Sequence, residues 1–281
     1  MKILRGSFIG VLSAVSVLAV SSAFAQSNTI IEKLENKESK SAKKLNVATS
    51  VDVSTNLLRN SSYAASQSLG ISFLPSYTLS EKFKVSSNVS ISNELKNNTD
   101  VTVNNIPVKL SYKSIKLSKG VLYRPSVSAY IPTNEVSRED GGLYTSVAIG
   151  QGISFSSIKG TKLSGSLGLG VKSNFHKYTR DSNNQANIKY SLTPTGGLSY
   201  GFTDDISLSA SMAYGVAYTY QGAEKLFYQA SQSLNYQINK KMSVSVYHSN
   251  GGSSTDYDGS ANVKVFDELA SEVGVSFTVI R

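Results

Sequence analysis

The sequence contains no cysteine, no tryptophan, two histidines and five prolines among its 281 residues. The lack of cysteine excludes disulfide bonds and the acylated cysteine of a lipoprotein. Long hydrophobic runs are also missing, because the main apolar run, from Phe8 to Val20, is shorter than the roughly 20 residues that a helix needs to cross a bilayer. We therefore expect no transmembrane helix, and any membrane attachment has to come from the fold itself.

The first residues have the order of a secretory signal peptide. Lys2 and Arg5 precede the apolar run, and a small-residue sequence at 23–25 follows it. This order predicts export, with cleavage after Ala25.

The mature chain is basic and long enough for one large domain. Removing Lys2 and Arg5 leaves 26 basic residues against 19 acidic ones. An exported protein rarely meets nucleic acid, so this excess favours acidic lipid headgroups or small anionic solutes as partners, and no nucleic acid. We expect a signal peptide (1–25), a polar N-terminal periplasmic segment (26–44) and one β-domain (45–281), without a cofactor or a metal.

From Leu45 onward the hydrophobic pattern has the period of two that is typical of strands. The alternating segments are roughly 10 to 16 residues long, which suits tilted strands that cross a membrane better than the strands of soluble sheets. About twelve segments show this pattern. They begin near Leu45, Ser68, Phe83, Ile106, Val121, Leu143, Lys162, Asn187, Ile206, Leu226, Met242 and Val265.

Tight turns and long polar loops alternate between these segments. The long loops fall near 97–105, 133–142, 179–186 and 251–262. Short turns on one side and long loops on the other resemble the porin-like outer-membrane β-barrels of Gram-negative bacteria, in which the short turns are periplasmic. In hydrocarbon every backbone donor and acceptor needs an internal partner, so such a sheet has to close. The sequence therefore predicts an all-β fold, a single closed antiparallel transmembrane β-barrel of about twelve strands in the outer membrane.

Aromatic residues test this topology, because they collect at both interfaces of a membrane and face lipid. Most are in register with the apolar side of their strand. Those near the short turns are Tyr77, Phe83, Tyr123, Phe155, Tyr200, Phe202 and Tyr236, and those near the long loops are Phe175, Tyr190, Tyr218, Tyr220 and Tyr228.

The C-terminal segment resembles the assembly signal of outer-membrane barrels. Its elements are polar Glu272, then Gly274, and the hydrophobic Phe277 and Val279 at alternate positions. Such barrels often finish on an aromatic residue, whereas this chain runs on to Arg281. The resemblance implies recognition by the barrel assembly machinery.

A different fold would also fit the alternation of apolar and polar residues, and four prolines count against uninterrupted strands. A secreted soluble β-sandwich or β-solenoid would pack the apolar face inward and expose the serine-rich face. Four prolines, at 75, 107, 125 and 194, also fall inside the predicted strands, where each deletes a ladder hydrogen bond. We interpret them as bulges or strand ends.

The residues predicted to face inward are small and polar, with a basic bias. Five cations are candidates to line a channel and set its selectivity: Lys109, Lys113, Arg124, Lys172 and Lys189. Lys84 is also basic, and Asp52, Glu94 and Glu272 are the inward acids. Rings of Lys and Arg line anion-selective pores. We expect Lys113 opposite Arg124, and a similar pairing of Lys172 with Lys189.

The first functional hypothesis is a passive porin-like channel for small hydrophilic solutes that favours anions, and not an enzyme. The second is a non-conducting barrel with a structural or adhesive role. The third is an outer-membrane lipid hydrolase, because His248 and Ser249 lie in a stretch similar to that of barrel phospholipases. Adjacent strand residues point to opposite faces, so the third requires a bulge between them. The sequence identifies neither the solute nor the oligomeric state.

Overall fold

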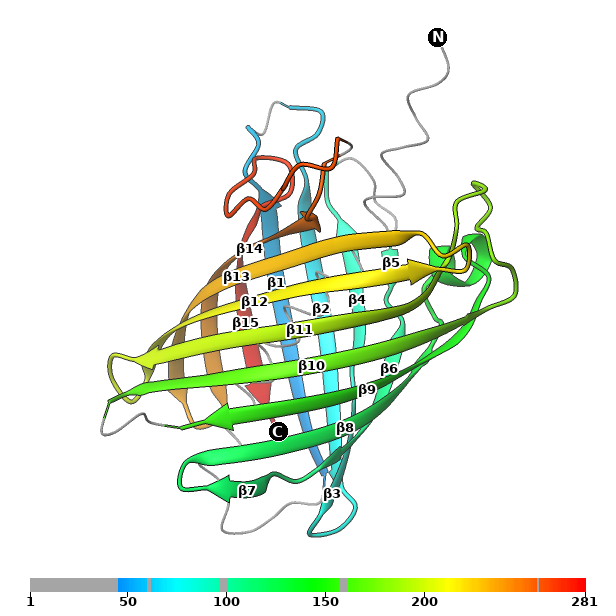
Figure 1. Ribbon diagram of the computed structural model, residues 1–281. Coiled ribbons are helices and arrows are strands. Elements are labelled where there is room, and N and C mark those ends of the chain that lie inside the picture. The colour runs from blue at the N-terminus through cyan, green and yellow to red at the C-terminus, as the bar shows by residue number, and fades with distance from the viewer. Residues whose placement is uncertain (1–44, 60–61, 97–100, 157–160, 257) are drawn as a thin grey trace.

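The computed structural model describes residues 45–59, 62–96, 101–156, 161–256 and 258–281. Over these residues the chain forms one antiparallel sheet that closes into a barrel of inclined strands (Figure 1). The predicted signal peptide (1–25) and N-terminal segment (26–44) lie outside the described residues. No helix in the described part of the chain is long and apolar enough to cross a membrane.

Fifteen strands and one turn of π-helix, η1 (Val136–Asp140), make up the fold. The strands are β1 (Leu45–Asn56), β2 (Gln67–Thr78), β3 (Phe83–Ser87), β4 (Val89–Glu94), β5 (Val101–Val103), β6 (Ile106–Tyr112), β7 (Ile115–Ser118), β8 (Val121–Ile131), β9 (Leu143–Phe155), β10 (Leu163–His176), β11 (Ile188–Gly201), β12 (Ile206–Thr219), β13 (Glu224–Asn239), β14 (Met242–Ser253) and β15 (Glu272–Ile280). Twelve strand positions form the closed wall, as predicted, because β3 and β4 both pair with β2 while β5 and β7 are short additions.

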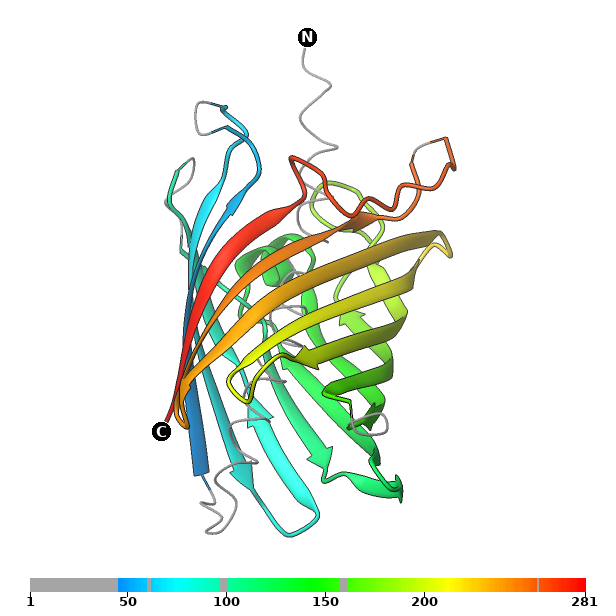
Figure 2. The same cartoon turned by 90° about the vertical axis from the view of Figure 1, so that its left-hand side faces the viewer.

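Closure joins the first strand to the last. β1 pairs with β15 from Ala48↔Ile280 to Asn56↔Glu272, and with β2 on its other side. Both views show β1 in blue beside β15 in red (Figure 2). Every wall strand therefore has two neighbours, which gives its backbone groups the internal partners that hydrocarbon requires.

The predicted strand starts agree with these bounds within two residues, except for the last strand. That strand was expected near Val265, and it begins at Glu272. The intervening residues form a turn, in which the Asp267 carboxylate accepts hydrogen bonds from the backbone N–H groups of Leu269 (3.0 Å) and Ala270 (3.1 Å). These bonds hold the segment out of the ladder although its apolar residues alternate like those of a strand.

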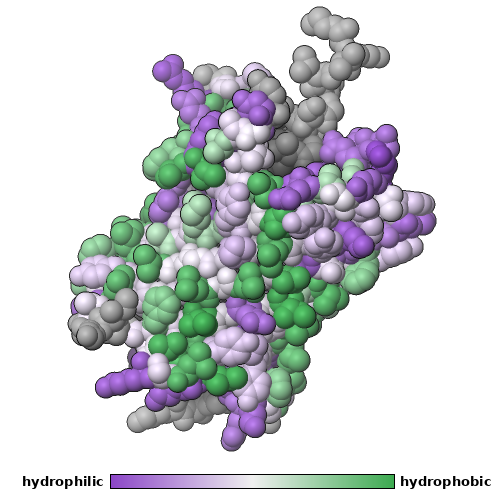
Figure 3. Space-filling view, viewed as in Figure 1, coloured by the Kyte–Doolittle hydropathy of each residue, from purple (hydrophilic) through white to green (hydrophobic). Residues whose placement is uncertain are grey.

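The two faces of the wall differ as predicted. On β12, outward Leu208 and Met212 are 45% and 47% exposed, whereas inward Ser207 is 8% exposed. On the face in Figure 3, hydrophobic residues cover much of the barrel wall. A soluble sandwich would bury these apolar side chains, so the closed barrel with its apolar exterior excludes that alternative.

The four prolines lie where a ladder is interrupted. Pro125 falls between the β6–β8 ladder, which ends at Ser126, and the β7–β8 ladder, which begins at Tyr123. Pro75 lies between the pairings of β2 with β4 and with β3, and Pro194 in a gap of the β11–β12 ladder. On its β3 side, Pro107 lies just beyond the last pair of the β3–β6 ladder. A residue without an N–H group is tolerated at such positions.

Most of the predicted aromatic girdle is exposed on the outside. Its exposed members near the short turns are Tyr77, Phe83, Tyr200, Phe202 and Tyr236, and those near the long loops are Phe175 and Tyr190. Two expectations were wrong. Tyr220 lies at the β12–β13 turn and packs edge-on against His176, 5.7 Å between ring centroids, while Tyr228 is 4% exposed.

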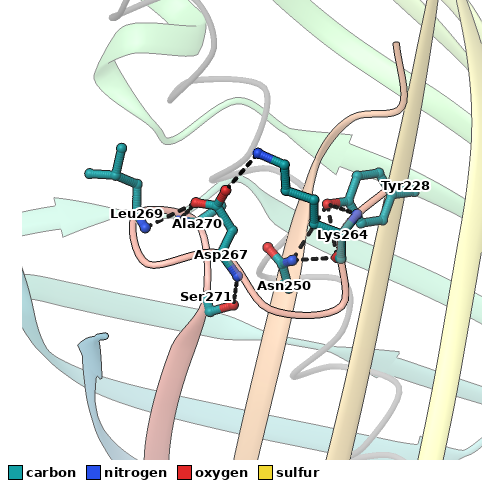
Figure 4. A network of polar contacts seen from close by, with 7 residues as sticks. All are labelled: Tyr228, Asn250, Lys264, Asp267, Leu269, Ala270 and Ser271. Carbon is teal, nitrogen blue, oxygen red and sulfur yellow. Dashed lines mark hydrogen bonds and ion pairs between the residues drawn. The ribbon is translucent and has the colours of Figure 1, made fainter. Parts of the chain in front are cut away.

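The loop between β14 and β15 covers Tyr228 from outside the barrel. Tyr228 and Asn250 have the outward parity of their strands, and both contact Lys264 of this loop (Figure 4). The Tyr228 hydroxyl donates to the Lys264 carbonyl (3.1 Å) and accepts from its backbone N–H (3.1 Å). Asn250 Nδ2 donates to the same carbonyl. The loop is thereby fastened to the outer wall rather than folded into the bore.

Candidate functional site in the barrel lumen

The lumen wall carries rows of hydroxyl groups that bond to one another. The hydroxyl oxygens of Ser211 on β12 and Ser231 on β13 lie 2.7 Å apart. Ser50 and Ser276 lie 2.9 Å apart between β1 and β15, and Thr278 donates to Ser50 at 3.2 Å. Each pair comes from inward positions of neighbouring strands. These rows make the wall hydrophilic without giving it charge.

Carboxylates gather on one side of the lumen. Asp52 on β1, Glu94 on β4 and Glu272 on β15 all have inward parity. The Asp52 carboxyl group lies over Gly70 of β2, where an added Cβ would be 2.8 Å from the carboxyl carbon. Glu94 Oε1 accepts a hydrogen bond from the backbone N–H of Gln67 (2.8 Å).

Cations gather on β6, β8 and β10. Lys109 and Lys172 belong to one row of the wall, through the pairs Lys109↔Ser128, Ser128↔Ala148 and Ala148↔Lys172. Arg124 on β8 also faces inward and pairs with Gly152. β10 lies six strand positions from β1 in either direction around the twelve-strand wall. The strand of Lys172 is therefore opposite the strand of Asp52 across the bore.

Two of the five predicted channel-lining residues do not lie on a regular wall ladder. The ladder between β6 and β8 ends at Ser111↔Ser126, and Lys113 lies exposed in the connection to β7. The expected pairing of Lys113 with Arg124 is therefore wrong, because the chain turns aside into the β7–β8 hairpin before reaching it.

Lys189 is at a register shift in β11, between Ile188 and Tyr190, and is exposed. Lys172 pairs with Ser191 instead, so the expected pairing of Lys172 with Lys189 is also wrong. A bulge breaks the strict alternation of faces, so counting residues does not fix the side on which Lys189 lies.

Glycines line the wall between the cations. Gly152 and Gly168 form one inward pair of β9 and β10, and Gly150 and Gly170 form the next. A Cβ added at Gly152 or Gly170 would meet no atom closer than 3.8 Å, and the atoms at that distance are backbone oxygens. At these two positions, therefore, the wall has space for a small side chain.

Three inward aromatic residues were not predicted. The Lys172 ammonium lies 4.4 Å from the ring centroid of Tyr130. The Phe227 ring covers Gly215, and the Tyr247 ring covers Gly274. Each shares the parity of inward residues on its own strand, so counting from the neighbouring serines could have found them.

The predicted assembly signal forms most of β15. Phe277 and Val279 face outward, whereas Glu272 and Gly274 face inward. A Cβ at Gly274 would lie 2.6 Å from the Tyr247 hydroxyl and 2.7 Å from the Val53 carbonyl oxygen. Gly274 thus has a packing role in the folded barrel, and recognition of the segment during assembly stays a prediction.

His248 and Ser249 lie on opposite faces of β14. The ladder with β13 is continuous here, with His248↔Gln232 and Ser249↔Ser231. His248 Nδ1 is 2.7 Å from Gln232 Oε1, and its ring lies 4.6 Å from that of Phe266 in the outer loop. The required bulge is not present, so the structure does not bring the two side chains together. The described residues contain no group of three or more His, Asp or Glu side chains that could hold a metal ion.

Comparison with known proteins yields matches of fold only. No family model and no curated protein matches the sequence. The chain is similar to the NanC porin (13% identity, TM-score 0.53, 84% of this chain and 99% of that chain). It is also similar to an outer membrane channel from Pseudomonas putida F1 (10% identity, TM-score 0.56, 84% and 95%). The KdgM porin in complex with disordered oligogalacturonate is a third match (13% identity, TM-score 0.50, 82% and 98%).

These three structures share the outer-membrane β-barrel fold with this chain. The closed barrel and its apolar exterior agree with that class and with the predicted location in the outer membrane of a Gram-negative bacterium.

Proposed function

We propose that the barrel is a passive channel for small hydrophilic solutes and that it favours anions. The observation that supports this most directly is the arrangement of charge in the lumen. Lys109, Arg124 and Lys172 lie on one arc of the wall, and the inward carboxylates lie on another.

The glycines between the cations add room for a solute. Because Gly152 and Gly170 have no side chain and no close neighbour, an anion can approach the wall there with the ammonium and guanidinium groups beside it. Lys and Arg rings at such positions select for anions in other pores. Cation-attracting carboxylates on the other arc reduce this preference, so we expect a moderate selectivity rather than exclusion of cations.

The similar structures support the transport hypothesis at the level of class. Two are described as porins and one as a channel. The KdgM structure was determined with oligogalacturonate, an anionic sugar, which agrees with an anion preference for this barrel.

The test is a recording of purified protein in planar bilayers under a KCl gradient. We expect discrete ionic steps and a reversal potential of the sign that indicates chloride preference. Replacing Lys109, Arg124 and Lys172 with Gln is expected to move the reversal potential toward cation preference. Each of the three single variants is also compared with Lys113→Gln, which removes one positive charge outside the wall and is expected to have a smaller effect.

The absence of steps at every voltage would exclude a channel and favour the non-conducting barrel. Unchanged selectivity in the triple variant would exclude these three cations as its cause. Release of fatty acid by the wild type, lost in Ser249→Ala, would instead support the hydrolase.

A further inference from the structure

A group of lysines surrounds the end of the barrel that carries the short turns. It consists of Lys82, Lys113, Lys116, Lys119, Lys162, Lys240 and Lys241, here called the lysine collar, and all seven are exposed. The acidic residues of the same turns are Glu81, Asp204 and Asp205. This end of the barrel is therefore strongly basic.

At the opposite end of the barrel, acidic side chains outnumber basic ones. The described residues of its loops include six basic side chains, Arg59, Lys96, Arg138, Lys177, Arg180 and Lys264. They also include eight acidic ones, Glu135, Glu139, Asp140, Asp181, Asp256, Asp258, Asp267 and Glu268. Two ion pairs, Arg138 with Glu139 and Lys264 with Asp267, lie at this end. No collar ammonium group has a carboxylate partner among the described residues, so the collar's charge is not neutralised there.

The collar lies where the lipid-facing surface ends. Lys82 directly precedes outward Phe83, which is 39% exposed, and Lys240 follows outward Ile238, which is 45% exposed. The Lys162 ammonium donates to the carbonyl of Phe202 (3.2 Å), whose side chain is 51% exposed. Lysines beside exposed apolar residues at the boundary of a membrane extend their ammonium groups to the level of the lipid headgroups.

We propose that the lysine collar binds the phosphate groups of anionic phospholipids in the membrane leaflet at the periplasmic end. A soluble anionic partner in the periplasm would fit the charge, but it would not require lysines to border the lipid-facing residues. A phospholipid satisfies both observations, because its phosphate meets the ammonium groups while its acyl chains cover Phe83, Ile238 and Phe202. Basic residues near an anionic lipid surface are attracted to it over about one Debye length.

The test compares thermal unfolding of the full chain in phosphatidylcholine vesicles with and without phosphatidylglycerol. Unfolding is measured as loss of the fast-migrating band on an unboiled gel. The collar variant replaces Lys82, Lys119, Lys240 and Lys241 with Gln. The control variant removes four cations from the opposite end, through Arg59→Gln, Arg138→Gln, Lys177→Gln and Arg180→Gln. Neither variant alters a residue of the proposed channel, and conductance does not enter the measurement.

We expect phosphatidylglycerol to raise the melting temperature of the wild type and of the control variant by several degrees. The rise is expected to be largely lost in the collar variant, and also in about 1 M salt, where the Debye length falls to about 3 Å. If the quadruple variant does not fold, Lys240→Gln with Lys241→Gln replaces it, and native mass spectrometry counts the phosphatidylglycerol molecules that each barrel retains.

An equal response of the two variants, or no response of the wild type to phosphatidylglycerol, would overturn the proposal. Collar-dependent sedimentation with purified cell-wall sacculi, without any collar-dependent lipid effect, would overturn it as well and assign the collar to the cell wall.

Discussion

The contact between Phe227 and Gly215 allows a quantitative test of how the lumen is packed. A Cβ on Gly215 would lie 2.5 Å from Phe227 Cε2 and 2.8 Å from Cε1, and its three nearest atoms all belong to that ring. Ordinary van der Waals contact needs more than 3.4 Å. Gly215→Ala therefore forces the ring to move, and overpacking of this kind costs about 1 to 3 kcal/mol.

The matched control is Gly170→Ala, another inward glycine in a wall strand. Its added Cβ would have its nearest neighbour at 3.8 Å, so we expect a change within about 0.5 kcal/mol. The free energy of unfolding is measured from urea titrations of the barrel in detergent micelles. Combining Gly215→Ala with Phe227→Ala is expected to remove the penalty of the first substitution, because the obstructing ring is then absent. An equal loss with and without the ring, or equal stability of the two alanine variants, would refute the packing argument.

Three further predictions concern the wall and the outer loop. Leu169→Arg, on the outward face, is expected to destabilise the barrel by about 2 to 4 kcal/mol, whereas Gly170→Arg, next to it on the inward face, is expected to be tolerated and to lower single-channel conductance. Tyr228→Phe removes a hydroxyl bonded to both the N–H and the carbonyl of Lys264, so cleavage of the outer loop by protease is expected to become faster while the barrel stays intact. Burial alone would raise the pKa of Asp267, but hydrogen bonds from Ala270, Lys264 and Leu269 outweigh it and lower the pKa below its usual 3.8. The ionised Asp267 carboxylate therefore stabilises the loop above pH 3.8, and this stabilisation is lost as the pH falls through the lowered pKa. Cleavage of the loop by protease is expected to become faster over that fall in pH, and Asp267→Asn is expected to abolish this dependence on pH.

The alternation of apolar and polar residues was sufficient to predict most strands of the barrel. The period of two identified the wall strands, because the lipid-facing side of each strand has to be apolar over its whole length. It was insufficient at the last strand, where Val263 and Val265 alternate as a strand would. The hydrogen bonds at Asp267 decide that case, and they depend on a turn conformation that the period does not report.

The lumen was predictable only where the ladders are regular. Lys109, Arg124 and Lys172 have the predicted inward parity, because each lies within a continuous ladder on at least one side of its strand, which for Arg124 is the ladder with β9. The expected partners of Lys113 and Lys189 were wrong, because Lys113 lies beyond the end of a ladder and Lys189 lies at a bulge. A single extra or missing residue reverses the face assigned to every later residue of that strand, so errors of this kind begin at interruptions of a ladder.

The contacts between inward side chains of neighbouring strands could not be predicted from the hydrophobic period. A shift of two residues between neighbouring strands leaves every residue on its original face, so the hydrophobic period cannot distinguish one such register from another. Yet that shift would take Phe227 away from Gly215, and Tyr247 away from Gly274, and place each ring against a residue with a Cβ. The close fit of these rings over glycines therefore favours one register among those that the hydrophobic pattern permits. For that reason the Gly215→Ala experiment also tests whether side chains inside the bore, and not only the lipid outside it, determine how the strands of this barrel align.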